Sequence, residues 1–299
     1  MLNLQATEKN LRNHLETLTR TIGERSVGTP WNLEKSAEYF ESVHRQVGLE
    51  PRRETYNFKG QTVANIVADL SFGDNEKKLF LLGAHYDSVK GTVGADDNGS
   101  AVAVQLEVAR ALKEFNERPP LDLTLRVVSF ALEEPPAYGT RFMGSRVYAR
   151  KAKAEGERLD GMICLEMVGY TCHEPGCQHY PFPLMFRNYP KTGDYIGIVG
   201  NYRSRKFTSA IFKAFQKNEA LPAIKLTIPW SGYLLPTVRL SDHASFWDRG
   251  YKAVMVTDTA FYRNPHYHRR SDTMDKLDFS FMARLVKSLA MFFVDQGRN

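Results

Sequence analysis

The sequence has little cysteine and no long apolar run. Three cysteines among 299 residues are too few for the disulfide framework of a small secreted domain. Cys172 and Cys177 are close enough to pair if oxidised, but we expect reduced thiols. The amino-terminal stretch MLNLQATEKNLRNHLETLTRTIG has an amphipathic helical pattern and lacks the apolar stretch of a signal peptide or membrane span. These absences favour a cytoplasmic protein with no membrane partner.

An excess of charge of one sign is also missing. The chain has 40 Lys and Arg against 34 Asp and Glu, and the basic residues are spread along it. This distribution is typical of an ordinary solvated surface, so we expect no nucleic-acid partner. An apolar content of 42% suits a soluble globular enzyme with a sizeable core.

What the sequence does contain is an alternation of strand and helix patterns. Short apolar runs predict strands at 63–70, 78–85, 123–132, 161–168, 195–200 and 252–258. Apolar residues at helical spacing predict helices at 98–115, 140–154, 204–217 and 278–296. Such alternation builds a mainly parallel sheet covered by helices on both faces. No repeat or long linker divides the chain, so we expect one α/β domain over residues 1–299.

Polar residues follow the predicted strands at their carboxyl ends, where ligand sites of open α/β sheets gather. His85 ends one strand, and Asp87 is placed to orient its ring, because a metal-bound imidazole usually donates its other N–H to a carboxylate. A hydrogen-bonded structural histidine is the alternative. Asp96 and Asp97 precede the next helix. Capping that helix requires only one such residue, so a second carboxylate is available for another role. A carboxylate has two oxygens and can bridge two cations.

Three further acidic positions and a histidine complete the pattern. Glu133 and Glu134 end the strand at 123–132 and point in different directions, so one can ligate a metal while the other moves a proton. Glu166 lies in an apolar strand, where a cation or a buried salt bridge must offset its charge. His268 follows the last predicted strand. Oxygen and nitrogen donors without thiolate suit two zinc ions that activate water.

Five motifs in this order carry a resemblance to a known family: GAHYDS, GADDNGSA, EE after a strand, LEM, and YHRRSDT followed by DKLD. Together they resemble the co-catalytic zinc aminopeptidases of the MH clan, whose relatives include glutamate carboxypeptidases and glutaminyl cyclases. The resemblance covers about residues 60 to 278. It implies a three-layer α/β/α fold with a mainly parallel, mixed central sheet, and two Zn²⁺ per chain.

The resemblance also implies roles for individual residues. Five would bind the two metals: His85, Asp96, Glu134, Glu166 and His268. Asp96 would bridge the metals, and its peptide bond to Asp97 would be cis. His85 and Glu166 would complete one metal site, and Glu134 and His268 the other. Glu133 would be the general base, and Asp87 would hold His85. Many aminopeptidases of this family have aspartate at the position of Glu166, so the substrate's polarity is left open.

The implied reaction is hydrolysis of the amino-terminal bond of a peptide or aminoacyl substrate. Glu133 would accept a proton from the attacking water and return it to the leaving amine. A single-zinc transferase like glutaminyl cyclase, a carboxypeptidase-type hydrolase and a non-catalytic binding protein are the alternatives.

Substrate contacts are predicted from loops and strand ends. Asp242 and His243 in SDHASFWDRG are candidates, with helix capping as the alternative, and so are Tyr170 and Tyr262. The segments 171–194 and 222–240 are rich in proline and aromatic residues and lack clear periodicity. We expect these loops to shape an apolar pocket rather than only to cover the sheet edge or form an oligomer contact.

Overall fold

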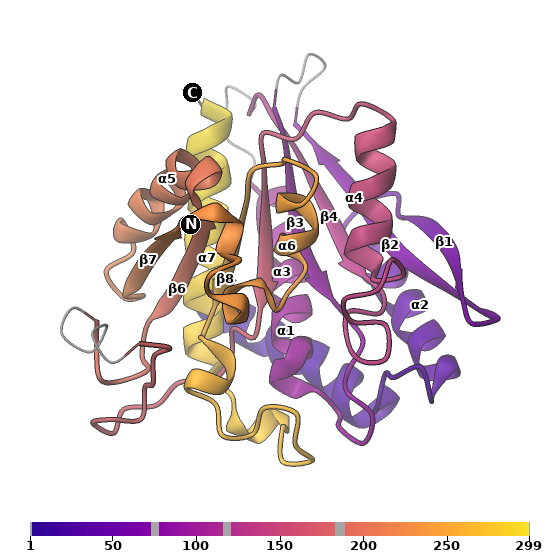
Figure 1. Ribbon diagram of the computed structural model, residues 1–299, viewed down its shortest axis with the longest axis horizontal. Helices are drawn as coiled ribbons and strands as arrows, with labels where there is room; N and C mark the ends of the chain where they lie inside the picture. The colour runs from indigo at the N-terminus through magenta and orange to yellow at the C-terminus, as the bar shows by residue number, and fades with distance from the viewer. Residues whose placement is uncertain (1, 73–77, 116–120, 183–188, 299) are drawn as a thin grey trace.

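An eight-stranded sheet forms the middle layer of the computed structural model, which describes residues 2–72, 78–115, 121–182 and 189–298 (Figure 1). The strand order is β1-β2-β4-β3-β5-β8-β6-β7. The strands are β1 (Arg52–Phe58), β2 (Gln61–Ser71), β3 (Leu79–His85), β4 (Thr124–Phe130), β5 (Gly161–Glu166), β6 (Ile196–Asn201), β7 (Ala223–Ile228) and β8 (Ala253–Thr257). The central pairs β4/β3, β3/β5 and β5/β8 are parallel, as is β6/β7, whereas β1/β2, β2/β4 and β8/β6 are antiparallel.

Helices cover both faces of this sheet. They are α1 (Leu4–Glu16), α2 (Pro30–Gln46), α3 (Ala101–Lys113), α4 (Gly144–Ala154), α5 (Arg205–Gln216), α6 (His243–Trp247) and α7 (Phe279–Arg298). One apolar cluster joins the sheet to α1, α2, α3, α5 and α7, and a second joins the opposite face to α4 and α6. The expected three-layer α/β/α fold with a mixed, mainly parallel sheet is therefore confirmed. Among the described residues, no helix combines the length and apolarity needed to cross a bilayer.

The central strands are apolar because both of their faces are covered. Every residue of β5 is buried, as are all but the first of β3. Strands buried on both faces read as continuous apolar runs, which is why the sequence predicts them well. The two edge strands were not predicted. β1 is mostly polar, and β7 has several half-exposed residues and falls in a segment expected to be a loop.

The state of two cysteines differs from the expectation. Cys172 and Cys177 form a disulfide, whereas reduced thiols were expected. A turn accounts for their approach, because Cys177 N–H donates to the Glu174 carbonyl at 3.1 Å and Gly176 has a φ of 90°. Spacing alone does not reveal that turn. Cys164 is free and buried in β5.

Candidate metal centre and active site

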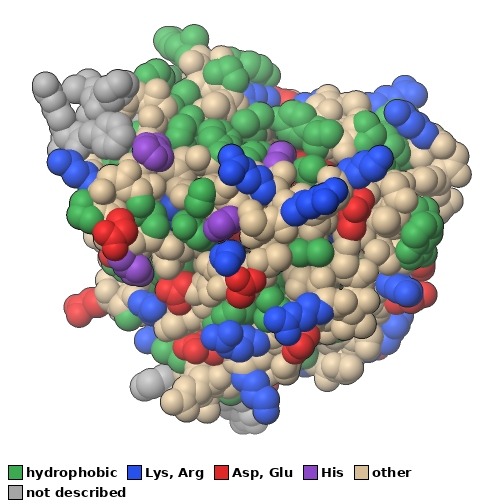
Figure 2. Space-filling model, turned by 90° about the horizontal axis from the view of Figure 1, so that it is seen from below, with side chains coloured by type: hydrophobic (Ala, Val, Ile, Leu, Met, Phe, Trp, Pro, Cys, Tyr) green, Lys and Arg blue, Asp and Glu red, His purple; other side chains and the backbone are tan. Residues whose placement is uncertain are grey.

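The carboxyl ends of three neighbouring strands meet at one edge of the sheet. His85 is the last residue of β3 and Glu166 the last of β5, while Glu134 follows β4, which pairs with β3. The strands run in parallel, so residues far apart in sequence converge there. Figure 2 views this edge, where histidine, acidic, basic and hydrophobic side chains all reach the surface.

Two clusters of potential metal ligands share one aspartate. The first contains His85, Asp97 and Glu166, and the second contains Asp97, Glu134 and His268; within each cluster the ligand atoms lie within 4.8 Å of one another. His85 Nε2 is 3.6 Å from Asp97 Oδ1, and His268 Nε2 is 3.2 Å from Asp97 Oδ2. Asp97 therefore offers one carboxylate oxygen to each cluster.

The donor atoms of these clusters fit divalent metal ions. His85 Nε2 is buried and has no hydrogen-bond partner among the described residues. Burial, together with the charge of Asp97, raises the pKa of Glu134 to about 8. Gathering carboxylates in the interior is unfavourable unless a cation offsets their charge. Imidazole nitrogens and carboxylate oxygens without thiolate are the ligands of catalytic zinc sites.

The structure corrects the expected bridging residue. Asp96 belongs to neither cluster, because its carboxylate accepts hydrogen bonds from Gly169 N–H at 2.9 Å and from the Asn264 side chain at 2.6 Å. Asp97 lies between the clusters instead. The cis peptide bond also falls one residue later than expected, between Asp97 and Asn98. Because the two aspartates are adjacent and chemically identical, the sequence does not show which side chain points toward the ligand clusters.

Asp87 links the ends of two strands. Its Oδ1 accepts from His85 Nδ1 at 3.2 Å and from Glu133 N–H at 2.9 Å, while its Oδ2 accepts from Glu134 N–H at 3.0 Å. It holds the His85 ring, as expected, and also fixes the backbone of both glutamates. Sequence reasoning missed this second role because it depends on strand pairing.

Glu133 is a carboxylate of the metal centre that is not among the potential ligands. It is buried, belongs to neither ligand cluster, and has Oε2 4.0 Å from His85 Nε2. Burial raises its pKa well above the ordinary value, and the nearby charges of Glu134 and Glu166 raise it further. A carboxyl group with a raised pKa is suited to accept a proton and release it again near neutral pH.

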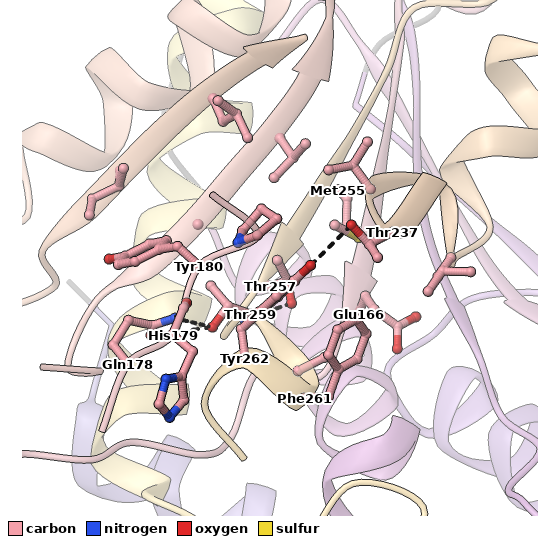
Figure 3. Close-up of a pocket in the computed structure, with 18 of the residues that line it drawn as sticks. Glu166, Gln178, His179, Tyr180, Thr237, Met255, Thr257, Thr259, Phe261 and Tyr262 are labelled. Atoms are coloured by element: carbon pink, nitrogen blue, oxygen red, sulfur yellow. Dashed lines mark hydrogen bonds between the residues drawn. The ribbon is translucent and has the colours of Figure 1, made fainter. Parts of the chain in front are cut away.

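Two adjoining cavities open at this edge. The first, the metal cavity, is lined by Asp97, Glu133, Glu134, Pro135, Tyr138, Glu166, Leu240, Tyr267 and His268. The second, the apolar pocket, is lined mainly by aromatic and aliphatic side chains, and Figure 3 shows Glu166 at one end of it and Tyr180 toward the other. Glu166, Leu240 and Tyr267 line both cavities. The apolar pocket therefore lies directly beside the metal cavity.

Comparison with known proteins identifies the family. Residues 65–293 match the model of peptidase family M28. The chain belongs to this family. A protein of Escherichia coli (strain K12) named "Uncharacterized protein YfbL" is 36% identical over 289 residues, which span 94% of this M28 chain and 86% of that protein.

Two more distant relatives carry names that describe an activity. A probable leucine aminopeptidase of Trichophyton verrucosum is 27% identical over 244 residues, 78% of this chain but only 57% of that protein. The zinc aminopeptidase BSAP of Bacillus subtilis has a similar fold, with a TM-score of 0.72 at 17% identity, covering 95% of this chain and 93% of that one. M28 is a zinc-dependent family, and this member has two candidate metal sites.

The loops predicted to shape a pocket do so in this M28 chain. Segment 171–194 contributes to the apolar pocket Gln178, His179, Tyr180, Pro181 and Tyr189. Segment 222–240 contributes Ile224, Leu226, Thr237, Val238 and Leu240. Residues 183–188 of the first segment lie outside the described residues. The pocket prediction is confirmed, although part of the second segment is strand β7 rather than loop.

Only one of the four substrate-binding candidates faces a cavity. Tyr262 lines the apolar pocket and its hydroxyl donates to Thr237 Oγ1 at 3.1 Å. Tyr170 lines neither cavity. Asp242 and His243 are completely buried and also line neither, so their expected contact with substrate is corrected. The alternative of helix capping is not confirmed for Asp242, because its side chain makes no hydrogen bond to the first N–H groups of α6.

Tyr267 is a further site residue that sequence reasoning missed. Its ring stacks on the His268 ring with centroids 3.7 Å apart, and it lines both cavities. Burial raises the pKa of its hydroxyl, and the surrounding carboxylates Asp97 and Glu166 add to the effect, so the group is a hydrogen-bond donor at neutral pH. The available signal was its place directly before His268 in the motif YHRRSDT.

Proposed function

We propose that this M28 peptidase is a zinc aminopeptidase that removes an amino-terminal residue with an apolar side chain. The observation that carries the proposal is that the metal cavity and the apolar pocket adjoin and share Glu166, Leu240 and Tyr267. A peptide whose scissile carbonyl lies in the metal cavity would extend one neighbouring side chain into that pocket. Binding one apolar side chain in a concave pocket is the usual basis of such selectivity.

The charge of the cavities supports an aminopeptidase over a carboxypeptidase. Among the described residues, no Lys or Arg lines either cavity. A substrate α-carboxylate would therefore have no Arg or Lys to pair with in either cavity. An α-ammonium group would instead find Glu133 and the ligand carboxylates close by.

Zinc and individual side chains would have separate roles in this reaction. Bound zinc would polarise the scissile carbonyl and make water a better nucleophile near neutral pH. Glu133 accepts the proton of the attacking water and then donates it to the leaving amine. Tyr267 offers a hydroxyl donor at the border of the two cavities, and Asp87 keeps the His85 ring in place.

The test combines metal content with a matched set of substrates. Leucyl and alanyl amides, each with a free and an acetylated amino group, are incubated with the protein before and after chelation. We expect two zinc ions per chain, cleavage of the free-amine substrates only, faster cleavage of the leucyl amide, and loss of activity on chelation. Cleavage that survives acetylation or complete metal removal would contradict the proposal.

The same experiment separates the alternatives. One zinc per chain, with cyclisation of an amino-terminal glutaminyl peptide, would identify a transferase like glutaminyl cyclase. Metal binding without turnover of any substrate would support a binding protein. Cleavage at the carboxyl end of a blocked peptide would favour a carboxypeptidase.

A further inference from the structure

Arg25 is a completely buried arginine outside the ligand clusters. Its guanidinium donates to five backbone carbonyl oxygens, those of Leu18, Gly23, Tyr86, Val93 and Gly94. The short contacts are Nε to Tyr86 at 2.7 Å, Nη1 to Val93 at 2.7 Å and Nη2 to Gly94 at 2.9 Å. Three of these carbonyls belong to a single loop, residues 86–94.

This loop joins two parts of the metal centre. His85 precedes it at the end of β3, and Asp97, the residue shared by both clusters, follows it. Ser88 strengthens the attachment, because its Oγ accepts from Arg25 N–H at 3.1 Å and donates to the Thr92 carbonyl at 3.1 Å. The loop thus wraps around the Arg25 side chain, which occupies its centre.

The end of this loop, at Gly94, is closely packed. Gly94 has a φ of 53°, and a Cβ at this position would lie 2.2 Å from the Asp97 carbonyl oxygen and 3.2 Å from Arg25 Nη2. The Asp272 carboxylate accepts the N–H groups of Asp96 at 2.8 Å and Asp97 at 3.1 Å. The backbone that carries Asp97 is therefore held at Gly94 and again at Asp97 itself.

The charge of Arg25 also acts on this region. Burial lowers its pKa to about 10, against the opposing effect of the charges of Asp87, Asp272 and Asp97, so it remains protonated at neutral pH. A fixed cation behind the ligand-bearing loop reduces the repulsion among these buried carboxylates. Its planar fork has five N–H donors and reaches five carbonyls, whereas the ammonium of lysine has only three donors.

We propose that Arg25 is a positioning residue for the metal centre, which holds loop 86–94 so that Asp97 lies between the two ligand clusters. The inference rests on the proposed zinc-dependent function, and it adds a residue that binds neither metal nor substrate. Partners that orient metal ligands commonly affect metal affinity or activity by about 10- to 100-fold.

The test compares Arg25→Lys with the control Arg126→Lys. Arg126 is also an arginine with several hydrogen-bond partners, donating to Asp69 at 2.7 and 2.9 Å and to Glu157, but it belongs to β4 and lines neither cavity. Zinc affinity is measured by competition with a chelator, and the ligand geometry by the visible absorption of the Co²⁺-loaded protein. Thermal unfolding of the metal-free protein reports stability alone.

For Arg25→Lys we expect a loss of zinc affinity of about tenfold or more, an altered Co²⁺ spectrum, and a lower kcat with KM little changed. Arg126→Lys should lower the unfolding temperature without changing zinc affinity or the spectrum. A change in unfolding temperature alone in Arg25→Lys would show a merely structural role and overturn the inference.

Two further outcomes are also decisive. If Arg25→Lys does not fold, Ser88→Ala removes the hydroxyl that fastens the same loop, and zinc affinity in that variant should fall by about threefold; an unchanged affinity would overturn the inference. The measurements on metal do not require turnover. A wild-type protein that binds zinc but cleaves no peptide would refute the proposed function alone, whereas unaltered metal binding in a folded Arg25→Lys variant would refute only the role of Arg25.

Discussion

The metal cavity and the apolar pocket share three lining residues but are built differently. The metal cavity combines residues that follow or end β4 and β5 with Asp97 and His268, which lie in connecting segments. Asp87 holds the backbone of Glu133 and Glu134, and Asp272 holds that of Asp97. Much of the apolar pocket is formed by loops, and its outer wall depends on side-chain contacts such as that of Gln178 with Arg263 at 2.8 Å. The groups proposed for the chemistry thus have their backbone fixed by buried carboxylates, whereas much of the surface proposed for selectivity lies on loops, which tolerate variation better.

This difference predicts how substitutions should act. Changes in the metal cavity should abolish turnover of every substrate, because they remove metal or the proton acceptor. Changes in the apolar pocket should redistribute activity among substrates and leave the metal content intact. Any substitution that does both would show that the two cavities are not separable.

The largest effect is expected for Asp97→Asn. An amide oxygen is a poorer zinc ligand than a carboxylate, and Asp97 serves both clusters. Metal content should fall below two per chain, and kcat/KM should fall by about a thousandfold or more. Asp96→Asn is the matched control, and it should retain both metals since its carboxylate faces Gly169 and Asn264. The reverse pattern, with metal lost only in Asp96→Asn, would reinstate Asp96 as the bridging residue.

Glu133→Gln should come next, with its effect confined to turnover. Glutamine keeps the shape of the side chain but cannot accept the proton, so kcat should fall by about 100- to 10,000-fold while two zinc ions remain bound. Glu107→Gln is a suitable control, because Glu107 is equally buried but pairs with Arg110 on α3. The metal content and kcat of both purified variants test this prediction. A near-normal kcat in Glu133→Gln would show that Glu133 is not the general base.

These cavities also differ in how much the sequence reveals. His85, Glu134, Glu166 and His268 were predicted as ligands, and the structure brings them together. Their residue types are unusual beside apolar strands, where burial demands a reason for each charge. The choice between two adjacent aspartates could not be made, since it depends on which side chain the backbone of the turn directs inward.

Outside the site, the strands that are most buried were the ones predicted best from the sequence. Central strands such as β3 and β5 are apolar up to their last residues, His85 and Glu166, and were predicted nearly to their ends. Edge strands β1 and β7 have exposed faces, so their sequences do not differ clearly from loops. The role proposed for Arg25 was invisible as well, because backbone carbonyls carry no sequence signal.

Within the apolar pocket, Leu226→Trp should alter selectivity. Leu226 lies on β7, lines the pocket and is half-buried, so a larger ring can occupy the space meant for substrate. Cleavage of the leucyl amide should fall by about tenfold in kcat/KM, and that of the alanyl amide much less. Thr227→Trp, on the exposed neighbouring residue, is the control and should change neither. Equal losses for both amides would mean that this pocket does not receive the substrate side chain.

The smallest effect is expected from breaking the disulfide between Cys172 and Cys177. It closes a short turn at the start of the loop that carries Gln178, but Gln178 is held independently by Arg263 at 2.8 Å and by Thr259 at 2.9 Å. The double variant with both cysteines changed to serine should therefore raise KM for the leucyl amide by only about threefold, with kcat and metal content unchanged. Reductant should have the same effect on the wild-type protein and none on the variant. A fall in kcat for every substrate would show that the pocket wall also supports the metal cavity, and the separation of the two regions would fail.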